Sequence, residues 1–281
     1  MTIQEFFQRE WAGVADAWHE WQLEARLQSA ASTDWIIELA RVRPGLRVLD
    51  LASGVGEPAL ELARRVGPSG RVVATDLVAG PLTILERSAS VAGLTWLETR
   101  VADMERLPFE DATFDVVTCR LGLMFSPRPQ RALAEARRVL QPGGRAAFVV
   151  WGSREQPLFA STLGVVAEIR SRTAEPVPAD APGPFRFAAP GRLTLELQRA
   201  GFSAVQEAER TLAWPLEGSA ERFWEMFRDL AGPTFRASID TLEADRRQAL
   251  SERVIRELEA FQHGNVIDPT ALLIGAVGAQ A

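Results

Sequence analysis

The stretch Val48-Leu-Asp-Leu-Ala-Ser-Gly-Val-Gly-Glu-Pro58 decides the fold. An apolar run leads to Asp50 near its end, and Gly54 and Gly56 follow where the chain must turn sharply. Glycines at such a turn let the main chain come close to a ligand. A helix over 58–65 is expected next, because a proline suits a first helical turn, where an N–H has no partner. The stretch therefore predicts a strand, a ligand-binding turn and a helix.

Short β-branched runs alternate with helical stretches on both sides of this turn, which is typical of a parallel sheet with crossover helices. The pattern predicts strands at 47–51, 71–76, 96–101, 114–119, 145–151, 202–210 and 271–278. It predicts helices at 58–65, 80–92, 129–140, 191–200, 219–230 and 242–261. Prolines crowd the segment 171–190, which indicates a long surface loop. The expected fold class is α/β.

Two carboxylates follow later strands of the predicted sheet. Asp76 ends the second strand, 20 residues after Gly56, where it can accept hydrogen bonds from both hydroxyls of an adenosine ribose. Asp103 follows the third strand and can accept from an adenine amine, beside the apolar Met104. A single Asp at a strand end is more often a turn former or helix cap. The joint spacing with the glycine turn favours a nucleoside site.

Three motifs in order, residues 48–56, 101–117 and 138–145, resemble the class I S-adenosylmethionine-dependent methyltransferases. The likeness is greater to the small-molecule branch that includes the ubiquinone and menaquinone biosynthesis methyltransferases, and it extends over 11–159. It implies a Rossmann-like, seven-stranded sheet whose last strand is antiparallel, and S-adenosylmethionine as cofactor.

The resemblance also implies a role for each residue of the site. Ala52, Ser53 and Gly54 would hold the methionine moiety, and Asp76 the ribose. Leu77 and Met104 would cover the adenine, Asp103 would accept from its amine, and Arg120 would lie near the cofactor's carboxylate. The predicted cofactor site is Asp50, Ala52, Ser53, Gly54, Gly56, Asp76, Leu77, Asp103, Met104 and Arg120. Ala52 departs from the family, since many members have a glycine there.

The expected organisation is a single domain over 1–281. Residues 1–43 would form an N-terminal helical lid, 44–151 the cofactor-binding core, and 152–281 the remaining strands with a substrate cap at about 214–265, inserted before the last strand. An apolar stripe at helical spacing marks the N-terminal segment: Phe7, Trp11, Val14, Trp18 and Trp21. Packing of this stripe on the core is favoured over direct contact with a ligand.

Composition excludes several chemistries in these 281 residues. There is no Tyr, and all 31 basic residues are Arg, so Schiff-base chemistry, a P-loop lysine and a Tyr/Lys dehydrogenase pair are impossible. One Cys and two His make a metal site improbable, and none is expected. A net charge of −6 without a basic run disfavours nucleic-acid and membrane partners. A soluble, cytoplasmic enzyme is expected, since no signal sequence or membrane-length apolar run is evident; its oligomeric state stays open.

The expected function is methyl transfer to an oxygen, nitrogen or carbon nucleophile of a small molecule, by in-line displacement. His19, beside the apolar stripe, is the hypothetical base if the acceptor must lose a proton. An apolar pocket for an aromatic, quinone-like or lipid acceptor is expected from Trp151, Phe159, Trp214, Phe223, Trp224 and Phe227. Arginines that could meet an acidic group on that acceptor are Arg186, Arg222, Arg228 and Arg236.

Three alternatives stay open. A nicotinamide-dependent oxidoreductase shares the glycine turn and the Asp, although Ala59 breaks its full glycine pattern. A non-catalytic cofactor sensor would keep the same pocket without turnover. A polyamine-type transferase would need an acidic amine-binding motif, and none is apparent.

Overall fold

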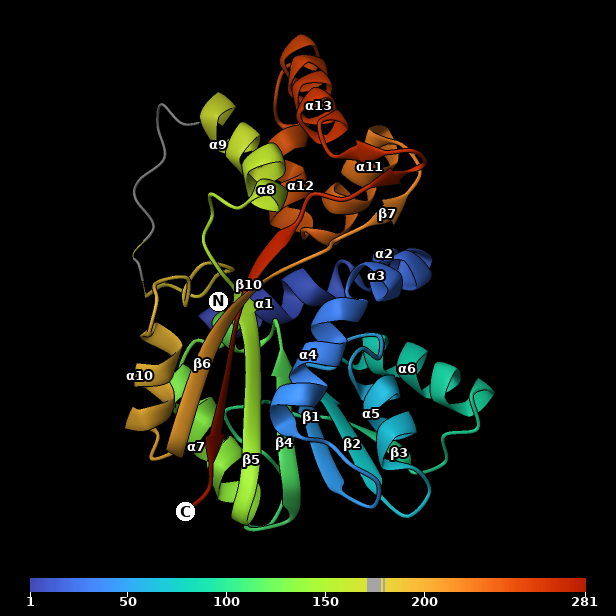
Figure 1. The fold of residues 1–281 in the computed structure, drawn as a ribbon. Helices are drawn as coiled ribbons and strands as arrows, with labels where there is room; N and C mark the ends of the chain where they lie inside the picture. The colour runs from blue at the N-terminus through green and yellow to red at the C-terminus, as the bar shows by residue number, and fades with distance from the viewer. Residues whose placement is uncertain (171–177, 179) are drawn as a thin grey trace.

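A seven-stranded sheet lies at the centre of the protein, in a computed structural model that describes residues 1–170, 178 and 180–281 (Figure 1). In spatial order its strands are β3 (Leu97–Val101), β2 (Arg71–Asp76), β1 (Arg47–Leu51), β4 (Phe114–Arg120), β5 (Leu140–Trp151), β10 (Ala271–Ala279) and β6 (Ser203–Leu212). The first five are parallel, whereas β10 is antiparallel to both β5 and β6. The predicted α/β sheet with an antiparallel last strand is confirmed.

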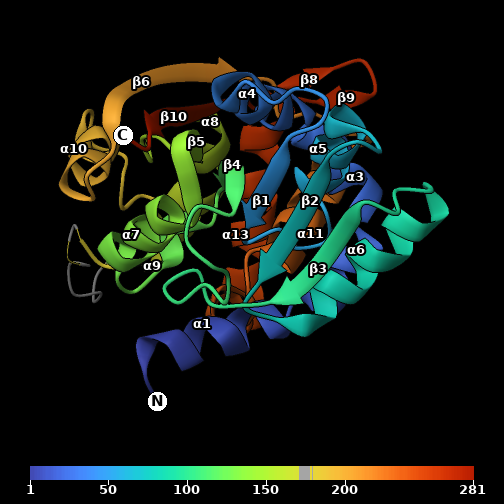
Figure 2. The ribbon, with the colours of Figure 1, turned by 90° about the horizontal axis from the view of Figure 1, so that it is seen from below.

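Helices cover both faces of this sheet, and Figure 2 shows α7 and α10 on one side and α5 and α6 on the other. Successive strand residues belong to opposite cores: Val48 packs with the cluster under α4 to α6, and Leu49 with the cluster under α7 and α10. The helices around the sheet are α4 (Ala30–Ala40), α5 (Ala59–Val66), α6 (Ala79–Val91), α7 (Pro129–Val139) and α10 (Arg192–Arg199). The inner strands β1, β2, β4, β5 and β10 are mostly apolar because both of their faces are buried, whereas the edge strands β3 and β6 are more polar and exposed.

The N-terminal segment is helical, as predicted, but it is divided into short helices. These are α1 (Ile3–Ala12), α2 (Ala15–Glu20) and α3 (Gln22–Gln28), followed by α4. The capping box of Thr2 and Glu5 starts α1. Within the apolar stripe Val14 and Trp21 are buried, while the other members are partly exposed. Figure 1 shows α1 to α3 lying between the sheet and the cap.

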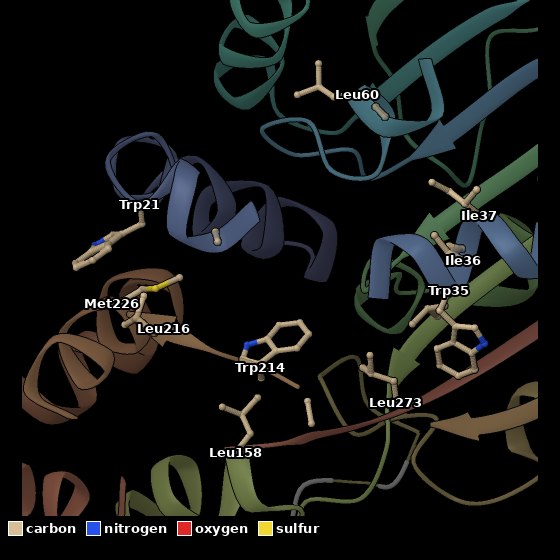
Figure 3. Close-up of a cluster of buried hydrophobic side chains, with 14 of the residues drawn as sticks. Trp21, Trp35, Ile36, Ile37, Leu60, Leu158, Trp214, Leu216, Met226 and Leu273 are labelled. Atoms are coloured by element: carbon tan, nitrogen blue, oxygen red, sulfur yellow. The ribbon is translucent and has the colours of Figure 1, made fainter. Parts of the chain in front are cut away.

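The predicted cap lies between β6 and β10. It contains α11 (Ala220–Leu230), α12 (Pro233–Asp240) and α13 (Ala244–Glu259). A small sheet closes it, with strands in the order β7 (Leu216–Glu217), β9 (Val266–Ile267) and β8 (Gln262–His263). Figure 3 shows how Trp21 of the N-terminal segment, Trp214 before the cap and Met226 of α11 belong to one buried cluster with Leu158. The N-terminal helices and the segment inserted between β6 and β10 therefore share a core with the sheet.

Several boundaries differ from those expected. β5 begins at Leu140, before the predicted strand over 145–151, because Gly143 N–H donates to the Gln280 carbonyl at 2.9 Å and extends the pairing. The segment after β5 contains α8 (Pro157–Phe159), η2 (Ala160–Gly164) and α9 (Val165–Arg170), and η1 (Leu123–Phe125) follows β4. Of the predicted loop at 171–190, residues 180–190 form turns and bends, and 171–177 and 179 lie outside the described residues. No helix in the described ranges is long and apolar enough to cross a membrane.

Candidate active site

A cavity of about 950 Å³ lies at the carboxyl ends of the parallel strands. Its floor comes from the segments after β1, β2 and β4, and its walls come from α1 to α3, the end of β5, α8 and the cap helices α11 and α12. The strand order reverses between β1 and β4, which is where open α/β sheets bind ligands. Most of the predicted site residues line this one cavity.

The turn after β1 has the tight backbone that the glycines predicted. Ala52, Gly54 and Gly56 have φ angles of 55°, 52° and 130°. A Cβ on Gly56 would lie 2.8 Å from Leu60 and 2.9 Å from Leu85, so only glycine lets α5 and α6 pack here. Gly56 therefore shapes the turn from behind and does not line the cavity, whereas Ala52 to Gly54 do.

Ala52 holds a left-handed backbone that costs a non-glycine residue about 1–2 kcal/mol. Its methyl group occupies space that Gly122 leaves free, because a Cβ on Gly122 would lie 2.4 Å from the Ala52 Cβ. The family's glycine at position 52 is thus replaced by alanine opposite a glycine on the β4 side of the site. The two positions are coupled through one steric contact.

Gly122→Ala is expected to destabilise the protein by about 1–3 kcal/mol through overpacking against Ala52. In an Ala52→Gly background the same change should cost less, because the opposing methyl is gone. Chemical denaturation of the wild type, both single variants and the double variant measures this coupling. Strictly additive free energies of unfolding would show that the two residues do not compete for space.

Asp76 closes the turn from the end of β2. Its Oδ2 accepts from Gly54 N–H at 3.0 Å, and its Oδ1 accepts from Val78 N–H at 3.0 Å. Burial raises the pKa of the Asp76 carboxyl, and these backbone hydrogen bonds oppose the rise. The side chain lines the cavity with both oxygens oriented by the main chain. The structure thus fixes this carboxylate beside the glycine turn, where a ribose is expected.

Asp103 lies at the cavity wall next to Met104, and Leu77 lines the cavity after β2. Asp103 Oδ1 accepts from Glu105 N–H at 2.9 Å, and Oδ2 accepts from the Gln4 side chain at 2.7 Å. Gln4 was not predicted as a site residue, because its partner Asp103 lies 99 residues away and no nearby residue indicates the contact. The hydrogen bond fixes α1 to the position where the adenine amine is expected.

Asp50 lies below the cavity lining and is fully buried. Its Oδ1 accepts from Thr118 Oγ1 at 2.6 Å, while Oδ2 has no hydrogen-bond partner among the described residues. Burial raises its pKa to about 7, against hydrogen bonds from Thr118 and Ser53 and the charge of Arg120. Asp50 therefore keeps one buried oxygen unpaired beneath the turn after β1.

Arg120 lines the cavity at the end of β4. It donates to the Glu57 carbonyl at 2.9 Å and more weakly to Ser32 Oγ at 3.4 Å, while its Nε has no partner in the described structure. Burial lowers its pKa, and the charges of Glu57 and Asp50 oppose this. Arg120 therefore presents a buried cation to the part of the cavity beside the turn after β1.

Glu57 and Arg26 form a cavity-lining ion pair that the sequence analysis missed. Arg26 Nε lies 3.2 Å from Glu57 Oε1, and burial raises the pKa of the Glu57 carboxyl against the charges of Arg120 and Arg26. The place of Glu57 in the glycine turn could have indicated a site residue. Nothing in the sequence around Arg26 indicated that it would reach the cavity.

The structure does not support His19 as a base. It is exposed on α2 and lies outside the cavity lining, whereas Trp18, the one aromatic residue of that short helix, lines the cavity. His263 is exposed on β8. The hypothesis that His19 takes a proton from the acceptor is therefore withdrawn.

Five of the six predicted aromatic residues line the cavity: Trp151, Phe159, Trp214, Phe223 and Phe227. Trp224 lies behind them, stacked on Phe227 at 6.0 Å between ring centroids. The four predicted arginines do not line the cavity. Three bond to other protein groups and the fourth lies over the Trp224 ring: Arg186 with the Ser126 carbonyl, Arg222 with Glu24, Arg236 with Asp229, and Arg228 over Trp224. The apolar part of the pocket is thus present without these cations.

Comparison with known proteins assigns the same class. Residues 49–148 match the model of the methyltransferase domain family. The ubiquinone/menaquinone biosynthesis C-methyltransferase of Bordetella avium is 43% identical over 119 residues, which are 42% of this chain and 46% of that protein. The match thus spans about half the length of the first such relatives. Residues 49–148 are therefore similar to a methyltransferase domain, in agreement with the class that the sequence motifs resemble.

Two further relatives extend over most of the chain. The nocamycin O-methyltransferase of Saccharothrix syringae is 28% identical over 256 residues, covering 84% of this chain and 85% of that protein. The solved structure of an N-methyltransferase from Haemonchus contortus, bound to S-adenosylhomocysteine, superposes with a TM-score of 0.58. It covers 100% of this chain and 61% of that chain at 14% identity, so this likeness shows the fold alone. The relatives differ in the acceptor atom that their names give.

Proposed function

We propose that this chain transfers the methyl group of S-adenosylmethionine to a small apolar acceptor bound between the sheet and the cap. One observation carries the proposal. The left-handed turn at Ala52 to Gly54, the carboxylate of Asp76 and the carboxylate of Asp103 line the same cavity as an aromatic chamber. A nucleoside can occupy the first part while an acceptor occupies the second.

The residues of the turn fit S-adenosylmethionine, whose sulfonium supplies an activated methyl group. Asp76 would accept from the ribose hydroxyls, while Leu77 and Met104 cover the adenine and Asp103 accepts from its amine. Ala52 to Gly54 would bind the methionine moiety, with Arg120 near its carboxylate and Asp50 below. The unpaired Asp50 Oδ2 and Arg120 Nε supply polar groups for that end. The protein's main task is then to hold the acceptor in line with the methyl group.

The organisation follows from the same proposal. Residues 1–43 act as the lid, 44–151 as the cofactor-binding core, and 214–265 as the acceptor cap within one domain. Trp11 of the lid packs edge to face with Phe125 of the core at 5.0 Å between ring centroids, and Phe7 packs on the same ring at 5.6 Å in a tilted arrangement. A net charge of −6 supports a small-molecule acceptor over nucleic acid, and a cytoplasmic location is proposed with it.

Thermal unfolding tests the cofactor assignment. S-adenosylmethionine or S-adenosylhomocysteine at about 100 times its dissociation constant should stabilise the folded protein by about 2.7 kcal/mol. For a chain of this size that is a rise of about 5–10 °C in Tm. A shift with NAD and none with the sulfur nucleosides would favour the oxidoreductase alternative instead.

Gln4→Ala is expected to tighten binding of S-adenosylhomocysteine by about threefold. Gln4 donates to the Asp103 oxygen that the adenine amine is proposed to use, so cofactor binding must break this hydrogen bond. Titration calorimetry of wild type and variant measures the difference, with Gln8→Ala, on the exposed surface of the same helix, as the matched control. Weaker binding in Gln4→Ala would show that Gln4 instead clamps the bound adenine.

A further inference from the structure

The acceptor side of the cavity is almost wholly apolar. We call this part the acceptor chamber, and its main residues are Trp151, Phe159, Trp214, Phe223, Phe227 and Phe235. They come from the end of β5, α8, the segment before β7, and the cap helices α11 and α12. Trp151 contacts both Phe159 and Trp214 edge to face, at 5.0 and 4.9 Å between ring centroids. An acceptor here is desolvated by aromatic surface.

The main residues of the acceptor chamber include no base, because all six are Trp or Phe. The chain contains no Tyr or Lys, and both histidines are exposed and lie outside the cavity lining. The charged residues that line the cavity are Glu10, Arg26, Glu57, Arg64, Asp76, Arg87, Asp103, Glu105 and Arg120. Four of these five carboxylates accept hydrogen bonds: Glu10 from Thr234, Asp76 from Gly54 and Val78, Asp103 from Gln4, and Glu105 from Arg128 and Ser126. Glu57, in the turn after β1, forms an ion pair with Arg26, while its Oε1 has no hydrogen-bond partner among the described residues.

The chamber does offer hydrogen-bond donors. Trp151 and Trp214 line it, and neither indole N–H has an acceptor in the described part of the chain. The indoles of Trp21 and Trp96, by contrast, donate to Asp229 and to the Ala63 carbonyl. Figure 3 shows Trp214 in the region where the N-terminal helices, the core and the cap meet. Neither nitrogen is a fully buried polar atom without a partner, so both N–H groups are open to the cavity and can donate to a bound ligand.

Building on the proposed function, we infer that the acceptor is an apolar organic acid that enters the chamber already ionised, as an oxygen or carbon anion whose oxygen accepts from the indole N–H groups of Trp151 and Trp214. The anion attacks the methyl carbon, and the new O–C or C–C bond forms as the C–S bond breaks. The bonding pair of that C–S bond stays on sulfur. An anion and a sulfonium thus become a neutral methylated product and a neutral thioether, and for an oxygen anion no proton is exchanged.

An apolar chamber favours this pairing of charges over methylation of an amine. Opposite charges attract more strongly where the effective dielectric constant is low, and both charges disappear in the reaction. With a neutral amine the positive charge instead passes from sulfur to the ammonium product, so no charges are neutralised. That ammonium must then lose a proton, and the main residues of the chamber include no base to accept it.

Binding of three probes with the same aromatic body tests the inference. Calorimetry compares 1-naphthoate, 1-naphthamide and 1-naphthylmethylamine, each with the protein saturated by sinefungin, which carries an ammonium in place of the methyl sulfonium. The carboxylate should bind about tenfold tighter than the amide and the amine. Its affinity should fall about tenfold when S-adenosylhomocysteine, which lacks the positive charge, replaces sinefungin. Equal or tighter binding of the amine would overturn the inference.

Phenylalanine variants separate the indole N–H from the aromatic surface. Trp214→Phe and Trp151→Phe should each weaken naphthoate binding about fivefold or more while changing naphthylmethylamine binding less than twofold. Trp96→Phe, outside the cavity, is the matched control and should change neither. A uniform loss for all probes would show a packing role only. If S-adenosylhomocysteine itself fails to bind, the proposed function fails; if it binds and the preference for the anion is absent, only the inference about the acceptor fails.

Discussion

Asp76→Ala is expected to weaken binding of S-adenosylhomocysteine by about 100-fold or more. The variant lacks the charged group that accepts hydrogen bonds from two ribose hydroxyls. Each such hydrogen bond contributes about 1.5–3 kcal/mol. The same carboxylate holds Gly54 and Val78 N–H, so the turn that binds the methionine moiety is loosened too. Titration calorimetry on the folded variant measures the loss. Unchanged affinity would place the ribose elsewhere.

Asp103→Ala is the matched comparison, because it removes a cavity carboxylate from the neighbouring strand end. Its effect should be smaller, since one adenine amine donates a single hydrogen bond and Gln4 already competes for the oxygen. The affinity of the wild type should also fall in acid, because the ribose site needs the ionised Asp76 and burial raises the pKa of that carboxyl. This fall should be absent in Asp76→Ala.

Asp50→Asn is expected to remove a large pH dependence from the stability of the protein. Burial raises the pKa of Asp50 in the folded state to about 7, above its value in the unfolded chain. The folded state therefore holds this proton more tightly, and the resulting stability is fully present below about pH 4 and is lost as the pH rises through 7. Between pH 5 and pH 7 the wild type should lose about 2–3 kcal/mol from this group.

Chemical denaturation at several pH values measures this dependence as the difference between variant and wild type. The free energy of unfolding of Asp50→Asn, relative to that of the wild type, should rise steadily from pH 5 to pH 7. Asp34→Asn, on the exposed side of α4, is the control and should give a constant difference across the same range. Parallel pH profiles for Asp50→Asn and the wild type would show that Asp50 is stabilised as the anion in the folded protein.

The central sheet and the cofactor half of the site were predictable, because each rests on local sequence. Strands of a parallel sheet are apolar runs, and their carboxyl ends meet at one edge. The residues following β1, β2 and the third strand, among them Gly54, Asp76 and Asp103, therefore had to converge. Leu77 and Met104 came with them as chain neighbours.

The lid and the details of the acceptor side were less predictable, because they depend on contacts between distant segments. The spacing of the aromatic stripe is the same for one helix or for three, so the break between α1 and α2 at Gly13 left no clear signal. The partner of Asp103 is Gln4, and the partner of Glu57 is Arg26. His19 stood at a plausible spacing beside the stripe, yet the rotation of a six-residue helix placed it in solvent.

Transfer of a labelled methyl group tests the central claim most directly. The protein is incubated with S-adenosylmethionine carrying a deuterated methyl group and a panel of apolar carboxylic acids, enols, phenols and amines, and mass spectrometry follows both products. We predict that S-adenosylhomocysteine and the deuteromethylated product of one of the acidic acceptors appear in equal amounts. Neither product should form with Asp76→Ala. A cofactor that binds at full stoichiometry and stays intact with every acceptor would contradict the claim and favour a sensor.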